Sequence, residues 1–340
     1  MLNIYDPQTA REGILKRLPP DEFPVSQQVL EGIASFFGEH LTPEQAVSRI
    51  LKDVRQQGDA ALREWAKTLD DYPDKPFRVP PEKFQTALNA IPDEQRQALE
   101  LSAERIRRFY KHQPLHSWLM QEGDGTLGQL IRPIQRVGLY VPGGTAPLPS
   151  SVLMSAVPAQ IAGVKEIAIA VPPVRGTGEV AEITLAAAAL VGVDEVYALG
   201  GAQAIAALAY GTESIKPVHK IFGPGNLFVT LAKRQVFGVV GIDGLAGPTE
   251  TMIIADENAR PGWVAADLLA QAEHDVLASA ILLTPSKKLA GEVQAEVAHR
   301  IEELPRAKIL AQSLDIGWQT PPMPPQGSID EERVKYLSFY

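Results

Sequence analysis

The hydrophobic positions of the chain follow two different patterns, and the change between them lies near residue 131. From residue 42 to about residue 110, apolar side chains such as Ala46, Ile50 and Val54 recur with the spacing of amphipathic helices. The segment Thr42-Pro43-Glu44-Gln45 before them is typical of a helix start, because threonine can cap, proline suits the first turn and glutamine can reach back. We therefore predict that the first 120 residues are mainly helical.

After residue 131, short apolar runs alternate with helical patterns. The runs cover residues 137–141, 166–171, 195–199 and 219–222, and glycine or proline follows each of them. A strand, a turn and a helix repeated in this way predict parallel strands joined by crossover helices, which is a doubly wound sheet. Such a sheet binds ligands at the carboxyl ends of its strands, where these glycine turns lie.

The same alternation continues after residue 250, with strands expected at 250–255 and 279–283 and helices at 260–274 and 286–304. We therefore predict an α/β fold with two Rossmann-like, doubly wound parallel-sheet domains and a helical N-terminal region. The expected divisions are an arm at 1–30, a discontinuous and incomplete α/β domain at 31–137 plus 250–314, an inserted Rossmann-like domain at 138–249, and an irregular tail at 315–340. The proline-rich stretch 321–328 supports the last assignment.

Composition narrows the functional classes. The net charge of −9 disfavours a general nucleic-acid binder and a protein that docks on anionic membranes. The absence of cysteine excludes disulfide scaffolds, thiolate metal sites and cysteine nucleophiles. The first residues lack the basic and apolar regions of a secretory signal, and no apolar stretch has the length of a membrane span. We expect a cytoplasmic protein.

Glycine-rich turns are the first candidate site. Gly143-Gly144, Gly200-Gly201 and Gly223-Pro224-Gly225 would let the backbone approach a ligand and leave helix N-termini open to an anion. None of them matches the G-x-G-x-x-G fingerprint or carries the Walker lysine. Two interpretations stay open at this point, tight structural turns and contacts to a nucleotide.

Gln271 and His274 are the second candidate site. Their spacing of three residues places both on one face of a helix, where an imidazole nitrogen and an amide oxygen can share a metal ion. Two ligands are too few to hold zinc, and the alternative is that His274 caps or packs at a helix end.

Two further pairs of polar residues have simpler interpretations. His112 and His116 have a metal-compatible spacing, but Pro114 between them argues against one continuous helix. Ser150-Ser151 lacks the G-x-S-x-G context of a nucleophile, and we interpret the pair as a helix cap.

Taken together, several stretches resemble the histidinol dehydrogenase family. They include Gly138-Leu-Tyr-Val-Pro-Gly-Gly144, Lys220-Ile-Phe-Gly-Pro-Gly-Asn226 and Asp267-Leu-Leu-Ala-Gln-Ala-Glu-His274, with residues 200–211, 232–235 and 246–250. The resemblance runs from about residue 20 to residue 314. It implies a zinc-dependent homodimer that oxidises L-histidinol to L-histidine through histidinal, in two NAD-dependent steps at the end of histidine biosynthesis.

The resemblance also implies roles for individual residues. Tyr140, Gln203 and Asn226 fall on positions that contact NAD, so the inserted domain is expected to bind the cofactor. Thr249 falls on a substrate-contacting hydroxyl position, which is usually serine in the family. Gln271 and His274 fall on ligands of both zinc and the substrate.

One departure from the family affects catalysis. The family's acid–base pair is a Glu-His dipeptide downstream of the matched region, and none occurs after Glu273-His274. The other zinc ligands, an aspartate and a histidine from the partner subunit, are also expected there. We therefore expect a truncated or frameshifted member with impaired catalysis. The alternative is a non-catalytic remnant or interaction protein that keeps the α/β fold. An unrelated nucleotide-binding enzyme would need another base, and the sequence shows none.

Overall fold

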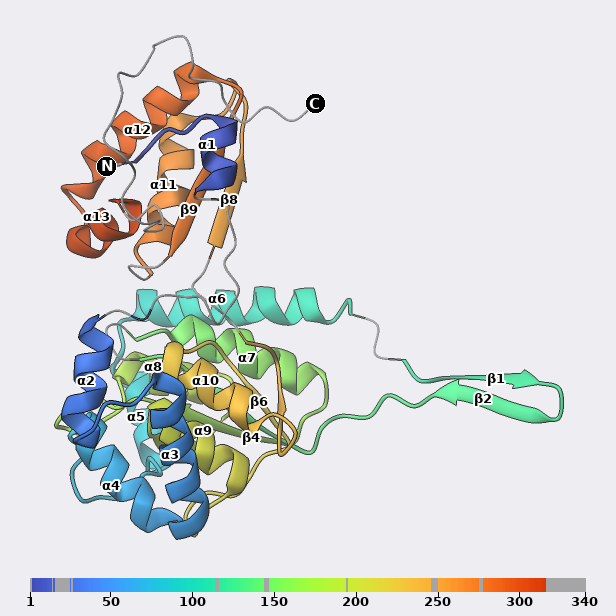
Figure 1. Ribbon diagram of the computed structural model, residues 1–340. Helices are drawn as coiled ribbons and strands as arrows, with labels where there is room; N and C mark the ends of the chain where they lie inside the picture. The colour runs from blue at the N-terminus through green and yellow to red at the C-terminus, as the bar shows by residue number, and fades with distance from the viewer. Residues whose placement is uncertain are drawn as a thin grey trace. The chain divides into compact units, whose positions relative to one another are not determined.

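The chain forms two compact units. A computed structural model describes residues 2–13, 15, 25, 27–113, 116–143, 147–193, 195–245, 250–274 and 278–315. The larger unit comprises residues 25–246, and the smaller unit comprises residues 1–24 and 247–340 (Figure 1). Each unit has its own cluster of buried apolar side chains. The described helices include none that is both long enough and apolar enough to cross a lipid bilayer.

The first part of the larger unit is helical, as predicted. Its helices are α2 (Gln27–Phe37), α3 (Pro43–Gln57), α4 (Asp59–Asp70), α5 (Glu82–Ala90) and α6 (Asp93–Tyr110). The expected start of α3 is confirmed, because Gln45 N donates to Thr42 Oγ1 at 3.3 Å and Thr42 N donates to Gln45 Oε1 at 2.9 Å. The reciprocal pair satisfies two backbone donors at the helix end.

A parallel sheet of five strands forms the centre of the larger unit. Its strands are β3 (Arg136–Tyr140), β4 (Glu166–Val171), β5 (Val196–Ala198), β6 (Lys220–Phe222) and β7 (Gly241–Ile242), in the order β5-β4-β3-β6-β7. In chain order this is 3-2-1-4-5, the strand order of the Rossmann fold. The predicted α/β class and parallel sheet are therefore confirmed.

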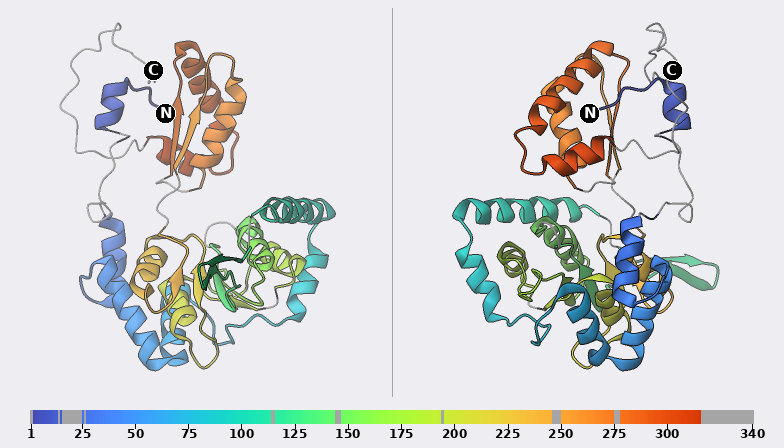
Figure 2. Two further views of the ribbon diagram at one scale, coloured as in Figure 1. Left: turned by 90° about the vertical axis from the view of Figure 1, so that its right-hand side faces the viewer. Right: turned by 60° about the vertical axis from the view of Figure 1, so that its left-hand side comes forward.

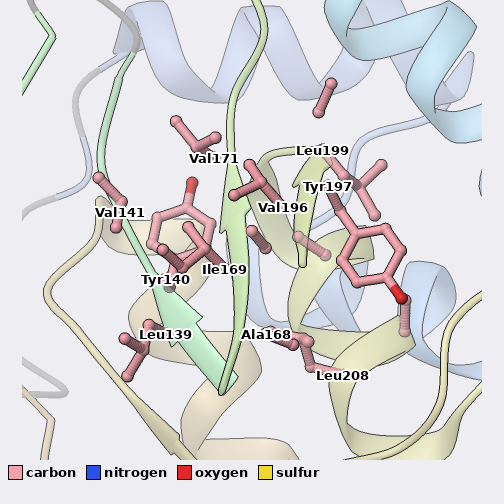
Figure 3. Packing of buried hydrophobic residues seen from close by; sticks show 14 of the residues in the cluster. Leu139, Tyr140, Val141, Ala168, Ile169, Val171, Val196, Tyr197, Leu199 and Leu208 are labelled. Atoms are coloured by element: carbon pink, nitrogen blue, oxygen red, sulfur yellow. The ribbon is translucent and has the colours of Figure 1, made fainter. Parts of the chain in front are cut away.

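Helices cover both faces of this sheet. The crossover helices are α7 (Pro149–Ile161), α8 (Glu182–Leu190), α9 (Gly201–Tyr210) and α10 (Leu227–Val236). The chain crosses the sheet in one direction from β3 through β4 to β5, and in the opposite direction from β5 to β6 and β7. Right-handed crossovers therefore place α7 and α8 on one face of the sheet and α9 and α10 on the other (Figure 2). Figure 3 shows part of the core, where Leu139, Ile169 and Val196 pack side by side.

The N-terminal helices belong to this sheet. Helix α3 packs on α9 and α10, α5 packs on α8, and α6 packs on α7. We had expected residues 31–137 to join residues 250–314 in one domain, but the contacts place 25–246 together. The reason is that the crossover helices have apolar outer surfaces, which the buried faces of α3, α5 and α6 cover.

A hairpin of two antiparallel strands, β1 (Trp118–Glu122) and β2 (Gly125–Gln129), was not predicted. It stands away from the sheet of the larger unit in Figure 1, and every residue of both strands is exposed. Its two-residue turn begins with Gly123 at φ +56°, the positive φ that a type II′ hairpin turn requires at this position. Glycine followed by aspartate at 123–124 is the sequence signal for this turn.

The smaller unit contains a parallel pair of strands, β8 (Glu250–Ile254) and β9 (Ser279–Leu283), and the helices α1 (Pro7–Glu12), α11 (Pro261–Ala272), α12 (Lys287–Ile301) and α13 (Ala307–Asp315). Helices α11 and α13 pack against the strands, and α12 packs on α11. The predicted strand–helix–strand alternation after residue 250 is confirmed. The N-terminal segment joins this unit, because Gln294 Nε2 donates to Leu2 O at 2.6 Å.

Candidate functional site

The candidate site of the larger unit lies where the sheet reverses its winding direction. Strands β3 and β6 are adjacent, and the chain leaves them toward opposite edges of the sheet. The crevice outside the carboxyl ends of two such strands is the usual ligand site of a doubly wound fold. The segments that border it here are 141–143 after β3 and 223–226 after β6.

Gly223 brings these two segments into close contact. Its φ is +117°, and a Cβ atom added to it would lie 2.0 Å from the carbonyl oxygen of Tyr140. No side chain can be accommodated at that distance. The turn after β6 therefore passes directly against the end of β3, and only glycine permits this approach.

Tyr140 links the end of β3 to the next glycine turn. Its side chain is buried, and its hydroxyl accepts a hydrogen bond from Gly201 N at 3.2 Å, at the first turn of α9. Burial raises the pKa of Tyr140 above its ordinary value, and the nearby carboxylate of Asp70 acts in the same direction. The phenol is therefore neutral at physiological pH and keeps a proton that it can donate.

Gln203 lies in the same turn of α9 and is only 1% exposed. Its Nε2 donates to Asp70 Oδ2 at 3.0 Å, whereas no described residue donates a hydrogen bond to its Oε1. Burial raises the pKa of Asp70, and the hydrogen bond from Gln203 opposes that rise. A buried acceptor without a partner costs about 1–3 kcal/mol, so its presence here marks a place that a ligand or water can complete.

Asn226 is exposed at the end of the turn after β6. Its Oδ1 accepts a hydrogen bond from Val229 N at 3.1 Å and caps α10. Because the oxygen is used in the cap, the amide nitrogen is the group that Asn226 offers to a ligand.

The geometry fits a dinucleotide. Tyr140 is the last residue of β3, Gln203 follows β5 and Asn226 follows β6, all at the carboxyl edge of the sheet. Gly223 lets the backbone of the turn after β6 pass close to the end of β3. The donors are the Asn226 amide and the Tyr140 hydroxyl, and Gln203 supplies the unpartnered acceptor. The three residues to which the family resemblance assigns NAD contacts thus lie at the same edge of one sheet, and their contact with NAD stays a prediction.

Gln271 and His274 lie at the end of α11 in the smaller unit. His274 Nδ1 is 2.7 Å from Ala270 O, and since a carbonyl only accepts, Nδ1 carries the proton. This contact leaves Nε2 as the ring nitrogen that can bind a metal, the usual arrangement of a zinc-ligating histidine. Gln271 is 8% exposed, and its Oε1 accepts a hydrogen bond from Thr251 Oγ1 at 2.9 Å. His274 Nε2 and Gln271 Oε1 are chemically suited to be two of the ligands of a zinc ion.

Thr249, the expected substrate-contacting residue, lies outside the described residues. Among the residues that the structure describes, no cluster of three or more histidine, aspartate or glutamate side chains could hold a metal. Tyr140, Gln203 and Asn226 belong to the larger unit, and Gln271 and His274 belong to the smaller unit.

Ser150-Ser151 does not cap a helix, and this prediction was wrong. Helix α7 begins one residue earlier, at Pro149, and Leu148 at its N-cap makes no side-chain hydrogen bond. His112 and His116 follow the end of α6 at Tyr110 and are both exposed, so they do not share a helix, in agreement with the effect expected from Pro114.

Asp70 and Thr251 were missed by sequence reasoning. Asp70 ends α4, far along the chain from Gln203, and nothing in its local sequence distinguishes it from a solvated helix end. Thr251 alternates with exposed residues of β8, which is a pattern that predicts only a half-buried strand position.

Comparisons with known proteins agree with the motifs. The family described as "Histidinol dehydrogenase" matches residues 39–319. The chain is 51% identical over 284 residues to histidinol dehydrogenase of Deinococcus radiodurans, which covers 84% of this chain and 64% of the relative. It is 52% identical over 271 residues to the Moorella thermoacetica protein, covering 79% of this chain and 64% of the relative.

A solved structure is similar as well. The crystal structure of histidinol dehydrogenase from Elizabethkingia anophelis matches with a TM-score of 0.79 and 34% identity, covering 92% of this chain and 69% of that chain. The chain thus spans somewhat less than two thirds of the length of the two curated relatives above. On the strength of the matched segment, its fold and its motifs, this chain belongs to the histidinol dehydrogenase family.

Proposed function

We propose that the chain takes part in the NAD-dependent oxidation of L-histidinol to L-histidine through histidinal, with zinc at the substrate. The observation that carries this proposal is the convergence of Tyr140, Gln203 and Asn226 at the carboxyl ends of the sheet in the larger unit. A Rossmann-type strand order with a glycine at the switch point supports a dinucleotide there.

The residues of the larger unit would hold the cofactor, which supplies the hydride acceptor when bound. Asn226 donates through its amide nitrogen while its oxygen keeps α10 capped. Gln203 is fixed by Asp70, so its free oxygen accepts from a hydroxyl or amino group of the ligand. Tyr140 is buried and keeps its proton, because burial raises its pKa.

The residues of the smaller unit would hold zinc and the substrate. His274 offers Nε2, because its Nδ1 proton is donated to Ala270 O, and Gln271 offers its side-chain oxygen, which Thr251 orients. Zinc supplies Lewis-acid chemistry when bound. We further propose that Thr249 contacts the substrate through its hydroxyl.

We propose that residues 1–340, assayed alone, turn over slowly. A base must accept the proton of the oxidised hydroxyl, and the printed sequence has no Glu-His dipeptide after His274. Formation of NADH from histidinol with added zinc measures this directly. A rate in the ordinary enzyme range of about 1–1,000 per second would contradict it.

The proposed setting is the cytoplasm, as a net charge of −9 suits neither nucleic acid nor an anionic membrane as partner.

A titration with NAD tests the cofactor site. Replacing Gln203 by methionine keeps the side-chain volume but removes both polar atoms, so we expect NAD to bind at least about 10-fold more weakly. Calorimetric titration of the wild type and the variant measures the change. The matched control is Gln235→Met on α10, whose amide donates to Glu44 O, and this variant should bind NAD as the wild type does. Equal affinity of Gln203→Met and the wild type would refute the assigned role.

We also propose that the chain forms a homodimer and that the β1–β2 hairpin takes part in it. Met120 and Leu127 are cross-strand partners, and Trp118 lies two residues along on the same face. The three side chains are 51%, 46% and 57% exposed for Trp118, Met120 and Leu127. An isolated hairpin of two strands is only marginally stable in water, so an apolar face of this kind is expected to be covered.

Charges placed on this hairpin face should separate the subunits. For the double variant Met120→Lys and Leu127→Lys, we expect the dimer dissociation constant to rise about 100-fold, because buried apolar anchors dominate interface energies. Sedimentation analysis over a concentration series measures it. The control is Gln121→Lys with Thr126→Lys, a cross-strand pair on the other face. If both double variants dimerise like the wild type, the hairpin is not the interface.

A further inference from the structure

Lys233 is a buried lysine that the proposed chemistry does not use. It lies on α10, is 2% exposed, donates from Nζ to Gly223 O at 2.9 Å and forms an ion pair with Oδ1 of Asp243. Burying an ammonium group is costly unless it is paired and hydrogen-bonded, and here both conditions are met by two neighbours. The sequence stretch 232–235 resembled the family without suggesting any role for this residue.

Asp243 completes the arrangement from the other side. It follows β7 directly, and its Oδ2 accepts a hydrogen bond from Gly223 N at 2.8 Å. Its own backbone N donates to Ile221 O at 3.1 Å, so the pairing of β7 with β6 fixes the position of its backbone. Lys233 and Asp243 therefore hold the two backbone polar groups of Gly223, one each.

Lys233 and Asp243 hold Gly223 at the point where the turn after β6 passes closest to β3. On its remaining side, Gly223 lies against the carbonyl of Tyr140, as the 2.0 Å approach of an added Cβ shows. The Gly223 backbone is thus confined by β3, α10 and the end of β7 at once. A buried ion pair stabilises a fold little more than well-packed apolar residues of the same volume. Its distinctive effect here is the fixed orientation of the turn that leads to Asn226.

We propose that Lys233 and Asp243 are positioning residues for the dinucleotide: they fix the turn 223–226 in the geometry that binds the cofactor. This proposal rests on the proposed NAD site. It assigns the pair no contact with the cofactor and no part in the chemistry. Their contribution is that the Asn226 amide and the backbone of the turn need no reordering when the ligand binds.

Two variants test the pair. Lys233→Met keeps the aliphatic volume and removes the ion pair, and Asp243→Ala removes the acceptor of Gly223 N. We expect at least 10-fold weaker NAD binding for each, and at least 10-fold faster hydrogen exchange at the Gly223 amide in Asp243→Ala without cofactor. If a single variant does not fold, the double variant Lys233→Met with Asp243→Asn takes its place, because it leaves no unpaired charge.

A matched control separates positioning from general destabilisation. Arg136→Met removes another buried ion pair in the same sheet, at the amino end of β3 and away from the switch turn. It should lower the midpoint of thermal unfolding and leave NAD affinity within twofold of the wild type. NAD affinity unchanged in Lys233→Met, or reduced as much by Arg136→Met, overturns the positioning role. A wild type that binds no NAD would instead refute the proposed function itself, and the positioning role with it.

Discussion

Replacing Gly223 by alanine should destabilise the larger unit by about 3–5 kcal/mol and abolish measurable NAD binding. The added methyl group would lie 2.0 Å from the carbonyl oxygen of Tyr140, at a φ of +117° that side chains rarely adopt. The turn cannot move away easily, because Lys233 and Asp243 hold both backbone polar groups of this residue. The midpoint of urea unfolding, followed by circular dichroism, measures the first effect, and titration with NAD measures the second.

Gly238 offers the control for this substitution. Its φ is +102°, close to that of Gly223, but no heavy atom lies within 4 Å of an added Cβ. Gly238→Ala therefore carries the cost of the backbone conformation without the collision, about 1–2 kcal/mol, and should bind NAD normally. If both variants lose the same stability, the contact with Tyr140 is not what restricts residue 223 to glycine.

Much of the architecture could be predicted because most strands of the parallel sheets have a local signature. The apolar runs 166–171 and 279–283 coincide with β4 and β9. The grouping of the N-terminal helices could not be predicted in this way, since it depends on which helix surfaces are apolar on their outer side. The hairpin at 118–129 was missed because its strands are short and bury none of their side chains, and because β2 carries two glycines.

The residues of the candidate site also differ in whether the sequence could predict them. Tyr140, Gln203 and Asn226 could be named only through the resemblance to the histidinol dehydrogenase family, because they fall on positions of its motifs. Asp70, Lys233 and Asp243 could not be named, because their roles come from contacts between different elements of the fold. Asp243 beside Gly244 suggests only a turn, and a lysine on a helix suggests only a solvated face. Burial is what distinguishes Lys233, and burial follows from the tertiary fold.

Arg136→Met should lower the free energy of unfolding of the larger unit by about 3–5 kcal/mol at neutral pH. The Arg136 side chain is 6% exposed and joins the amino ends of three strands, with Nη1 2.8 Å from Glu195 Oε2 and 3.0 Å from Glu166 Oε2. Its removal leaves Glu195, which is 17% exposed, with the hydroxyl of Tyr197 at 2.7 Å as its remaining side-chain partner in the described structure. Unfolding in urea measures the loss.

Two comparisons assign this loss to the unpaired carboxylate. The double variant Arg136→Met with Glu195→Gln should recover most of the stability, because it leaves no buried charge without a partner. Arg49→Met, which breaks an ion pair with Glu39 whose side chains are 48% and 56% exposed, should cost less than about 1 kcal/mol. A double variant no more stable than Arg136→Met alone would show that the loss comes from packing of the arginine stem.

The free energy of unfolding that is lost in Arg136→Met should also depend on pH. Burial would raise the pKa of Glu195, but the hydrogen bonds from Arg136 and Tyr197 outweigh it and hold that pKa below its ordinary value. A carboxylate with a lowered pKa in the folded state contributes its stability above the pKa of the unfolded chain, about 4.3, and loses it as the pH falls through the folded value. In Arg136→Met, burial is no longer opposed by the arginine, so Glu195 takes up a proton at higher pH and the penalty of an unpaired charge disappears. The stability difference between the wild type and the variant should therefore be largest near pH 7, begin to shrink above about pH 4.3 and continue to shrink as the pH falls further. A difference that stays constant from pH 7 to pH 3 would mean that the charge of Glu195 does not contribute to it.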